Sequence, residues 1–172
     1  AGGRTVLVAD TNVHELPSAE QLADFAVQTA AIARQLGHEP RVALLSFSNF
    51  GNPPREKAVR IREAVLVLDQ RRVDFEYDGE MQANVALNYG LMKELYPFCR
   101  LSGPANILIM PALHSANIAA KLMQELGGIS FGPVLVGLSK PVQIVQTGAT
   151  VNELVTAAAF ASLATTPLST LR

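Results

Sequence analysis

The chain has 172 residues, a net charge of −1, 49% hydrophobic and 17% charged residues, which suits one well-buried domain over residues 1–172. This balanced charge gives no electrostatic reason to expect nucleic acid or an anionic membrane as a partner. The single cysteine, Cys99, excludes an internal disulfide and a metal site built from several cysteines. No apolar run is long enough to span a bilayer, and the chain begins with neither a signal-peptide pattern nor a methionine. We therefore expect an excised or C-terminal piece of a larger cytoplasmic protein.

Strand and helix patterns alternate along the sequence. The predicted strands cover residues 4–9, 41–45, 75–77, 105–110 and two short runs within 132–148. The predicted helices cover residues 18–36, a segment opened by residues 53–54, residues 82–95, a segment from about 111 that ends at 127–128, and residues 150–164. The tail over 165–172 is expected to be loose. Repeated strand–helix units predict the α/β class, as a three-layer α/β/α sandwich with a mostly parallel sheet and helices on both faces.

Polar residues follow the predicted strands, at the edge where open α/β sheets bind their ligands. These strand-end loops are residues 10–12, 46–51, 78–82, 111–117 and 146–148. In the second of them, Ser46, Ser48 and Asn49 offer hydroxyl and amide groups, and Gly51 offers a flexible backbone. That loop is either a cradle for phosphate or pantetheine, or an ordinary solvated loop.

Several side chains in these loops have two interpretations each. Asp78 and Glu80 flank Gly79, where a carboxylate pair would do acid–base work or hold a metal, or would cap the following helix. His114 lies near a helix start, and a catalytic triad there would need an acidic partner that the sequence does not identify. The three scattered histidines lack the spacing of a zinc site.

Residues 132–148 lead from predicted strands into the start of a helix, an arrangement typical of phosphate-binding sites in α/β proteins. Lys140 either contacts a phosphate there or is an ordinary solvated lysine. Glu153 also has two possible roles. It is either the third residue of a capping box with Thr150, or a carboxylate that assists the deprotonation of a thiol.

Five segments together resemble the second half of a phosphate acetyltransferase domain: ADTNVHELPSAEQLADFA, EPRVALLSFSNFG, DGEMQANVALN, GPANILIMPALHSANIAAKLMQELGG and GPVLVGLSKPVQIVQTGATVNELV. Residues 95–103 and the run PALHSANIAAKL are similar to one branch of that family. This branch is the C-terminal phosphotransacetylase-like domain of bacterial NADP-dependent malic enzymes. The resemblance implies a fold of two α/β lobes with coenzyme A bound near the cleft between them, of which the first lobe is missing from this chain.

The resemblance also indicates which reactive groups differ. The family's Ser-Arg pair maps to Gln146 and Thr147, and its catalytic aspartate maps to Glu153, the one catalytic candidate. Ser48-Asn49-Phe50-Gly51 stands where acetyltransferases usually have Ser-Thr-Lys-Gly. Without the arginine of the Ser-Arg pair, the chain would lose a charge that stabilises the transition state, and such a loss typically costs about 10²–10³-fold in rate. The implied acetyl-CoA-binding residues are Ser46, Ser48, Asn49, Gly51, His114, Asn117, Gly137, Lys140, Gln146, Thr147 and Gly148.

The family pattern thus implies a regulatory segment that binds acetyl-CoA as an effector and itself lacks acetyltransferase chemistry. Its expected partners are a second copy, as a homodimer or higher oligomer, and a missing N-terminal malic enzyme domain. That domain would oxidatively decarboxylate malate to pyruvate with NADP and a divalent metal, whereas this segment is expected to hold no cofactor or metal. Two alternatives remain open. One is an active phosphate acetyltransferase that transfers acetyl between acetyl phosphate and coenzyme A, with Glu153 as base, and the other is a purely structural assembly domain.

Overall fold

The computed structural model describes residues 3–54, 56–127, 131–145 and 147–163. The chain divides into two compact units, Ala1–Lys121 and Leu122–Arg172, and each is described by itself. The predicted loose tail, and Gly128 at the expected end of a helix, lie outside the described residues.

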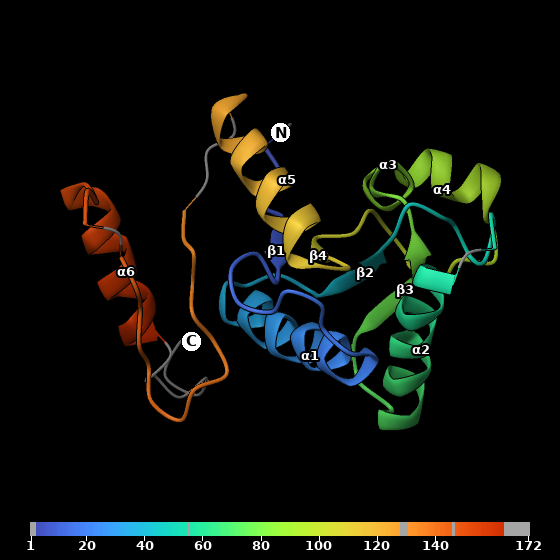
Figure 1. Ribbon diagram of the computed structural model, residues 1–172, viewed down its shortest axis with the longest axis horizontal. Helices are drawn as coiled ribbons and strands as arrows, with labels where there is room; N and C mark the ends of the chain where they lie inside the picture. The colour runs from blue at the N-terminus through green and yellow to red at the C-terminus, as the bar shows by residue number, and fades with distance from the viewer. Residues whose placement is uncertain (1–2, 55, 128–130, 146, 164–172) are drawn as a thin grey trace. The chain divides into compact units, whose positions relative to one another are not determined.

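The first unit contains a parallel sheet of four strands in the order β1-β4-β2-β3. The strands are β1 (Leu7–Ala9), β2 (Arg41–Leu45), β3 (Glu76–Met81) and β4 (Ile107–Ile109). β2 and β4, the two central strands, are almost wholly buried, because helices cover both faces of a parallel sheet. All four strands run in one direction, so their carboxyl ends meet at one edge of the sheet (Figure 1).

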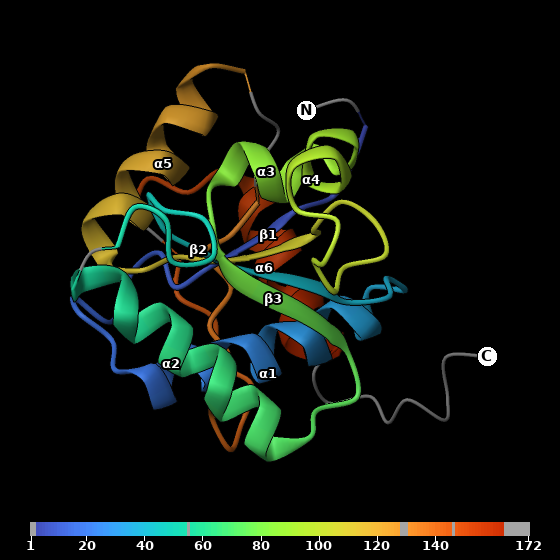
Figure 2. The ribbon, with the colours of Figure 1, turned by 90° about the vertical axis from the view of Figure 1, so that its right-hand side faces the viewer.

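Two long helices cover one face of this sheet, α1 (Ala19–Gln35) and α2 (Glu56–Arg71), as Figures 1 and 2 show. The predicted capping box of α1 is confirmed: the Ser18 hydroxyl accepts from the Gln21 backbone N–H, and the Gln21 side chain accepts from the Ser18 backbone N–H. Small residues of α1 and aliphatic residues of α2 pack on the central strands. Their buried members are Leu22, Ala23, Ala26, Ala30, Ala33, Ile61, Ala64, Val65 and Leu68.

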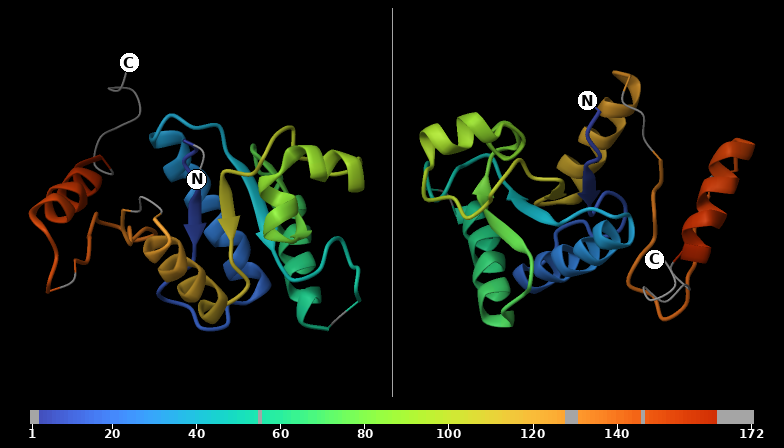
Figure 3. Two further views of the ribbon diagram at one scale, coloured as in Figure 1. Left: turned by 90° about the horizontal axis from the view of Figure 1, so that it is seen from above. Right: turned by 180° about the vertical axis from the view of Figure 1, so that it is seen from behind.

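The opposite face is covered by α3 (Ala83–Leu87), α4 (Tyr89–Leu95) and the first residues of α5 (Leu113–Glu125), which Figure 3 shows from two further sides. The prediction of one helix over 82–95 is wrong, because Asn88 leaves the helical region at φ −110° and ψ 95°. Its side chain then accepts a hydrogen bond from the Leu91 N–H at 3.1 Å and caps α4.

β3 continues to Met81, well beyond the predicted 75–77, so Asp78, Gly79 and Glu80 lie within a strand and not in a loop. A close approach to β2 explains why glycine occupies this strand position. A Cβ on Gly79 would lie 2.8 Å from the carbonyl oxygen of Leu44, which is closer than a side chain can come. The register between β2 and β3 shifts directly after Leu44.

The second unit contains α6 (Val151–Leu163). The two strands predicted within 132–148 are wrong for the described residues, which form no strand there. The Leu135 backbone pairs with a side chain in place of a strand: its N–H donates to the Gln143 amide oxygen at 3.0 Å, and its carbonyl accepts from the Gln143 nitrogen at 3.2 Å. Gly137 lies between these residues at φ 84°, and Phe131 stacks on Phe160 of α6 with ring centroids 5.0 Å apart.

Candidate functional site

The carboxyl edge of the sheet in the first unit gathers the polar residues that follow its strands. The β2–α2 loop (residues 46–52) is organised there by one buried carboxylate, Glu80 of β3, whose side chain is 0% exposed. Its Oε1 accepts hydrogen bonds from the Ser48 hydroxyl at 2.8 Å, the Gly51 N–H at 2.9 Å and Arg62 Nη1 at 3.1 Å. Oε2 is buried and has no hydrogen-bond partner among the described residues. Glu80 therefore anchors the β2–α2 loop to β3.

Further bonds tie the same loop to the start of α3. The Asn49 side-chain oxygen accepts from the Gln82 N–H at 2.8 Å, and the Gln82 amide nitrogen donates to the Phe47 carbonyl at 2.6 Å. Ser48 and Asn49 are buried, whereas Ser46 is half-buried at the carboxyl end of β2. The predicted cradle lies at the expected edge, but its Ser48 and Asn49 side chains hold the loop in place.

Phe50, the next residue of the loop after the buried Asn49, packs in an aromatic cluster. Its ring centroid lies 5.1 Å from that of Tyr96 and 5.0 Å from that of Phe98. These distances are typical of favourable ring pairs. An apolar contact therefore occupies this position of the loop.

At the end of β1, Asp10 accepts hydrogen bonds from the backbone N–H groups of Asn12, Val13 and His14, and its Oδ2 lies 2.8 Å from His14 Nδ1. Burial alone would raise the pKa of Asp10, but these bonds outweigh it and lower the pKa below its usual value. Asn117 donates to the Thr11 carbonyl at 3.3 Å, so this predicted site residue supports the same loop. His114 is exposed on the first turn of α5.

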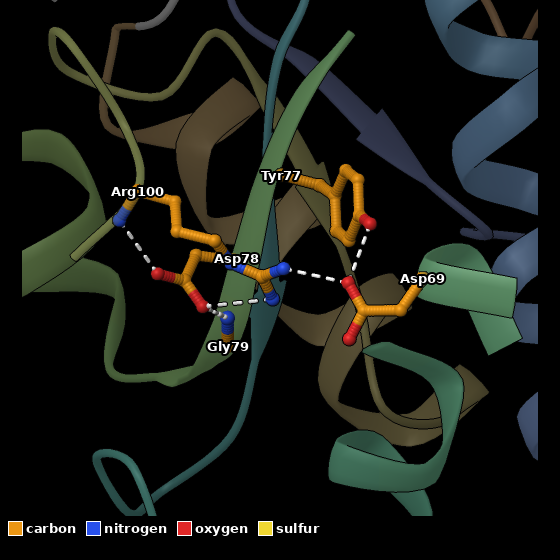
Figure 4. Close-up of polar contacts among 5 residues, drawn as sticks. All are labelled: Asp69, Tyr77, Asp78, Gly79 and Arg100. Carbon is orange, nitrogen blue, oxygen red and sulfur yellow. Dashed lines mark hydrogen bonds and ion pairs between the residues drawn. The ribbon is translucent and has the colours of Figure 1, made fainter. Parts of the chain in front are cut away.

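Asp78 and Glu80 do not share partners as a catalytic or metal-binding pair would. Asp78 accepts from the N–H groups of Gly79 and Arg100 at 2.9 and 2.8 Å, and Figure 4 shows the Arg100 guanidinium reaching Asp69 as well. Within the described part of the chain, no three His, Cys, Asp or Glu side chains gather as a metal site would require. The helix-capping role is also wrong, because both carboxylates bond elsewhere.

Two ionisable groups adjoin this network. Burial, and then the hydrogen bond to Asp69, raises the pKa of Tyr77 to about 12. Burial is also the main cause that raises the pKa of the Cys99 thiol to about 11, with nearby Asp78 contributing. Neither group is therefore suited to ionise near neutral pH, and the network is structural.

The remaining predicted residues belong to the second unit. Gly137, Lys140, Thr147 and Gly148 are exposed there, and Gln146 lies outside the described residues. Glu153 forms the predicted capping box, because its Oε2 accepts from the Thr150 N–H at 2.7 Å and from the Thr150 hydroxyl at 2.9 Å. The Thr150 backbone bond first, and then its hydroxyl, lower the pKa of Glu153.

The sequence matches the family described as Phosphate acetyl/butaryl transferase over residues 1–162. The chain belongs to this family. Crystal structures of its members share the fold: a phosphotransacetylase from Streptococcus pyogenes matches with a TM-score of 0.89 and 30% identity over 95% of this chain and 50% of that one. A phosphotransacetylase from Staphylococcus aureus matches with a TM-score of 0.85 and 30% identity over 96% of this chain and 51% of that one.

Relatives in this family include enzymes of two kinds. The NADP-dependent malic enzyme of Rhizobium meliloti is 59% identical over 93% of this chain and 21% of its own length. The phosphate acetyltransferase of Treponema pallidum is 41% identical over 89% of this chain and 47% of its own length. The chain thus spans about a fifth of the malic enzymes it matches. None of the helices in the described residues is long and apolar enough to cross a membrane.

Sequence reasoning missed three groups that shape this edge of the family fold, namely the Asp10–His14 pair, Arg60 and Arg62. The spacing of Asp10 and His14 is a local signal that could have pointed to their contact. Arg62 meets a carboxylate 18 residues further along the chain, and no local pattern predicts that pairing.

Proposed function

We propose that this chain is the regulatory, phosphotransacetylase-like segment of an NADP-dependent malic enzyme, and that it binds acetyl-CoA without transferring its acetyl group. The 59% identity to the Rhizobium meliloti malic enzyme supports the choice of parent protein. In this proposal the parent is cytoplasmic, and its other domain uses NADP and a divalent metal to convert malate to pyruvate.

The observation that carries the non-catalytic part is the state of Glu153. Its Oε2 is occupied by two donors of Thr150, which lower its pKa and so weaken it as a base. A carboxylate whose pKa is lowered accepts a thiol proton less readily than one with an ordinary pKa. Thr147 also offers no positive charge where the resemblance implies arginine, whose guanidinium can bind two phosphate oxygens side by side.

Binding can persist without these reactive groups, because a coenzyme is held by many separate contacts. Ser46 and His114 remain accessible at the carboxyl edge of the first unit, and Lys140 is exposed in the second. To regulate the parent enzyme, acetyl-CoA must bind two of its states with different affinity. Such a difference is typically worth about 1–3 kcal/mol.

Two measurements on one preparation of the full-length protein test this proposal. We expect calorimetry to detect acetyl-CoA binding, and an assay with acetyl phosphate and coenzyme A to detect no turnover above the background of a Glu153→Gln variant. A folded sample that gives no binding signal with acetyl-CoA would contradict the proposed effector.

The 41% identity to the Treponema pallidum phosphate acetyltransferase favours a second candidate, an active acetyltransferase. Turnover that is robust in the wild type and lost in Glu153→Gln would establish this alternative and overturn the non-catalytic proposal.

We also propose that the chain contributes to a homo-oligomer. Val151, Leu154 and Val155 give α6 an exposed apolar surface within the second unit, and such a surface is commonly buried by a second copy. Light scattering of the full-length protein at micromolar concentration is expected to show a dimer or larger species. A monodisperse monomer would refute this part.

A further inference from the structure

Two arginines of α2 reach past the carboxyl end of β2 in opposite directions. Arg60 Nη2 donates to the carbonyl of Pro111, just after β4, at 2.7 Å. Arg62 Nη1 donates to Glu80 of β3 at 3.1 Å. Because β2 lies between β4 and β3, the two guanidinium groups flank the start of the β2–α2 loop, where Ser46 follows the strand.

The two arginines differ in how their charge is balanced. Arg62 is paired with the buried carboxylate of Glu80. Arg60 is half-buried, and among the described residues its only hydrogen-bond partner is the neutral carbonyl of Pro111. Its Nε is buried and has no partner there. A cation that is partly removed from water without a counter-charge costs free energy, so an arginine in this state is suited to an anionic ligand.

Two acidic side chains at this edge, Asp10 and Glu80, are already engaged with other groups, and no ion pair joins Arg60 to a carboxylate of the described residues. Asp10 bonds to His14 and to three backbone N–H groups. Glu80 Oε1 holds Arg62, Ser48 and Gly51. In the described part of the edge, Arg60 therefore leaves a positive charge that no carboxylate contacts.

We propose that Arg60 binds a phosphate group at the carboxyl end of β2, and that Glu80 is a positioning residue that holds Arg62 and the β2–α2 loop beside it. The ligand class is a phosphate ester or anhydride, because a guanidinium presents N–H groups in a fork that matches two phosphate oxygens. The inference rests on the proposed function where it takes acetyl-CoA as the natural source of that phosphate. Free inorganic phosphate shares the same chemistry.

The test measures binding of acetyl-CoA and, separately, of inorganic phosphate to the full-length protein and to Arg60→Gln. The matched control is Arg72→Gln, which removes the same charge just beyond the other end of α2, where the Arg72 side chain is exposed and makes no polar contact with a described residue. For each of the two probes that the wild type binds, we expect Arg60→Gln to weaken binding by about tenfold or more, because charge-assisted hydrogen bonds are lost. Arg72→Gln should stay within about twofold of the wild type, as a surface change remote from a site does.

Stability separates a ligand-binding role from a structural one. If Arg60 serves the ligand, Arg60→Gln weakens binding while its melting temperature without ligand changes little, because removal of an unpaired charge offsets the loss of the single bond to the Pro111 carbonyl. A merely structural arginine would lower the melting temperature and leave the affinity unchanged. If Arg60→Gln fails to fold, Arg60→Lys is the variant to measure, because it keeps the positive charge but lacks the paired N–H groups of a guanidinium. We expect Arg60→Lys to bind the probes about threefold or more weakly than the wild type, and an unchanged affinity in this variant would overturn the inference.

The outcomes distinguish this inference from the proposed function. Wild-type acetyl-CoA affinity in a folded Arg60→Gln overturns the phosphate site and leaves the acetyl-CoA proposal standing. Phosphate binding that is lost in Arg60→Gln, in a protein that does not bind acetyl-CoA, upholds the site and refutes the proposed effector. Absence of binding by both probes refutes both.

Discussion

Replacing Glu80 with alanine tests whether this one carboxylate organises the β2–α2 loop. The change removes the acceptor of three hydrogen bonds, from Ser48, Gly51 and Arg62. It leaves the fourth loop contact, the bond from the Phe50 N–H to the Glu80 carbonyl at 2.7 Å, because that bond uses the backbone. The loop should therefore loosen without detaching fully from β3.

The expected cost follows from what each donor loses. A buried donor left without a partner costs about 1–3 kcal/mol, which applies to the Ser48 hydroxyl, whereas the Gly51 N–H is only partly buried and costs less. Arg62 contributes less, because its side chain is 34% exposed and can turn to water. We expect a total loss of about 3 kcal/mol of unfolding free energy, which for a chain of this size lowers the melting temperature by roughly 6–12 °C.

Denaturant and thermal unfolding of the full-length protein, followed by a probe of the family domain, measure this loss. Glu63→Ala is the matched control, because Glu63 is exposed on α2 and forms no ion pair with a described residue. It should change stability by no more than about 0.5 kcal/mol. If Glu80→Ala also stays within about 1 kcal/mol of the wild type, Glu80 does not anchor the loop, and its positioning role fails with it.

Three further predictions concern other parts of the chain. Asp78→Ala should lower the free energy of unfolding by about 2–4 kcal/mol, because the backbone N–H groups of Gly79 and Arg100 lose their acceptor. Asp69→Ala should lower it by less than about 1 kcal/mol, because Asp69 is exposed, and equal losses in denaturant unfolding would contradict this ranking. Burial raises the pKa of the Cys99 thiol from 9.0 to about 11, so Cys99 should react with iodoacetamide at pH 8 roughly 100-fold more slowly in the folded than in the unfolded protein. The folded state should also lose stability as the pH rises from 9.0 to about 11, because only the unfolded thiol ionises in that range. Fast labelling under native conditions would refute that assignment. Ser18→Ala should lower stability by about 1 kcal/mol through loss of the α1 cap, and an unchanged denaturation midpoint would show that the cap is dispensable.

Features that depend on local sequence were predictable. The capping boxes at Ser18 and Thr150 appear where their Ser/Thr-x-x-Glu/Gln spacing placed them. The strand over residues 41–45 has the predicted bounds, because a short apolar run between polar ends has few other ways to bury itself. The sandwich with helices on both faces followed from the alternation of these patterns.

Features that depend on distant partners were not predictable. Glu80 and Ser48 are 32 residues apart, and only the pairing of β2 with β3 brings them together. The same pairing extends β3 through Gly79, which a sequence pattern marks as a turn. The strands predicted within 132–148 fail for a related reason, because an apolar run becomes a strand only if a neighbour supplies hydrogen bonds. Leu135 bonds instead to the side chain of Gln143.

Phe50 contributes packing to the β2–α2 loop through two aromatic contacts. A lysine in that position would carry its charge to water and give up the contacts with Tyr96 and Phe98, each worth about 0.5–1.5 kcal/mol beyond the area it buries. Glu153 contributes to the start of α6, because its carboxylate accepts hydrogen bonds from both donors of Thr150. Arg60 differs from these two residues, since it keeps an uncompensated charge that packing alone would not favour. In the proposed function, the unpaired guanidinium of Arg60 binds an anion, while Phe50 contributes to packing and Glu153 to the capping of α6.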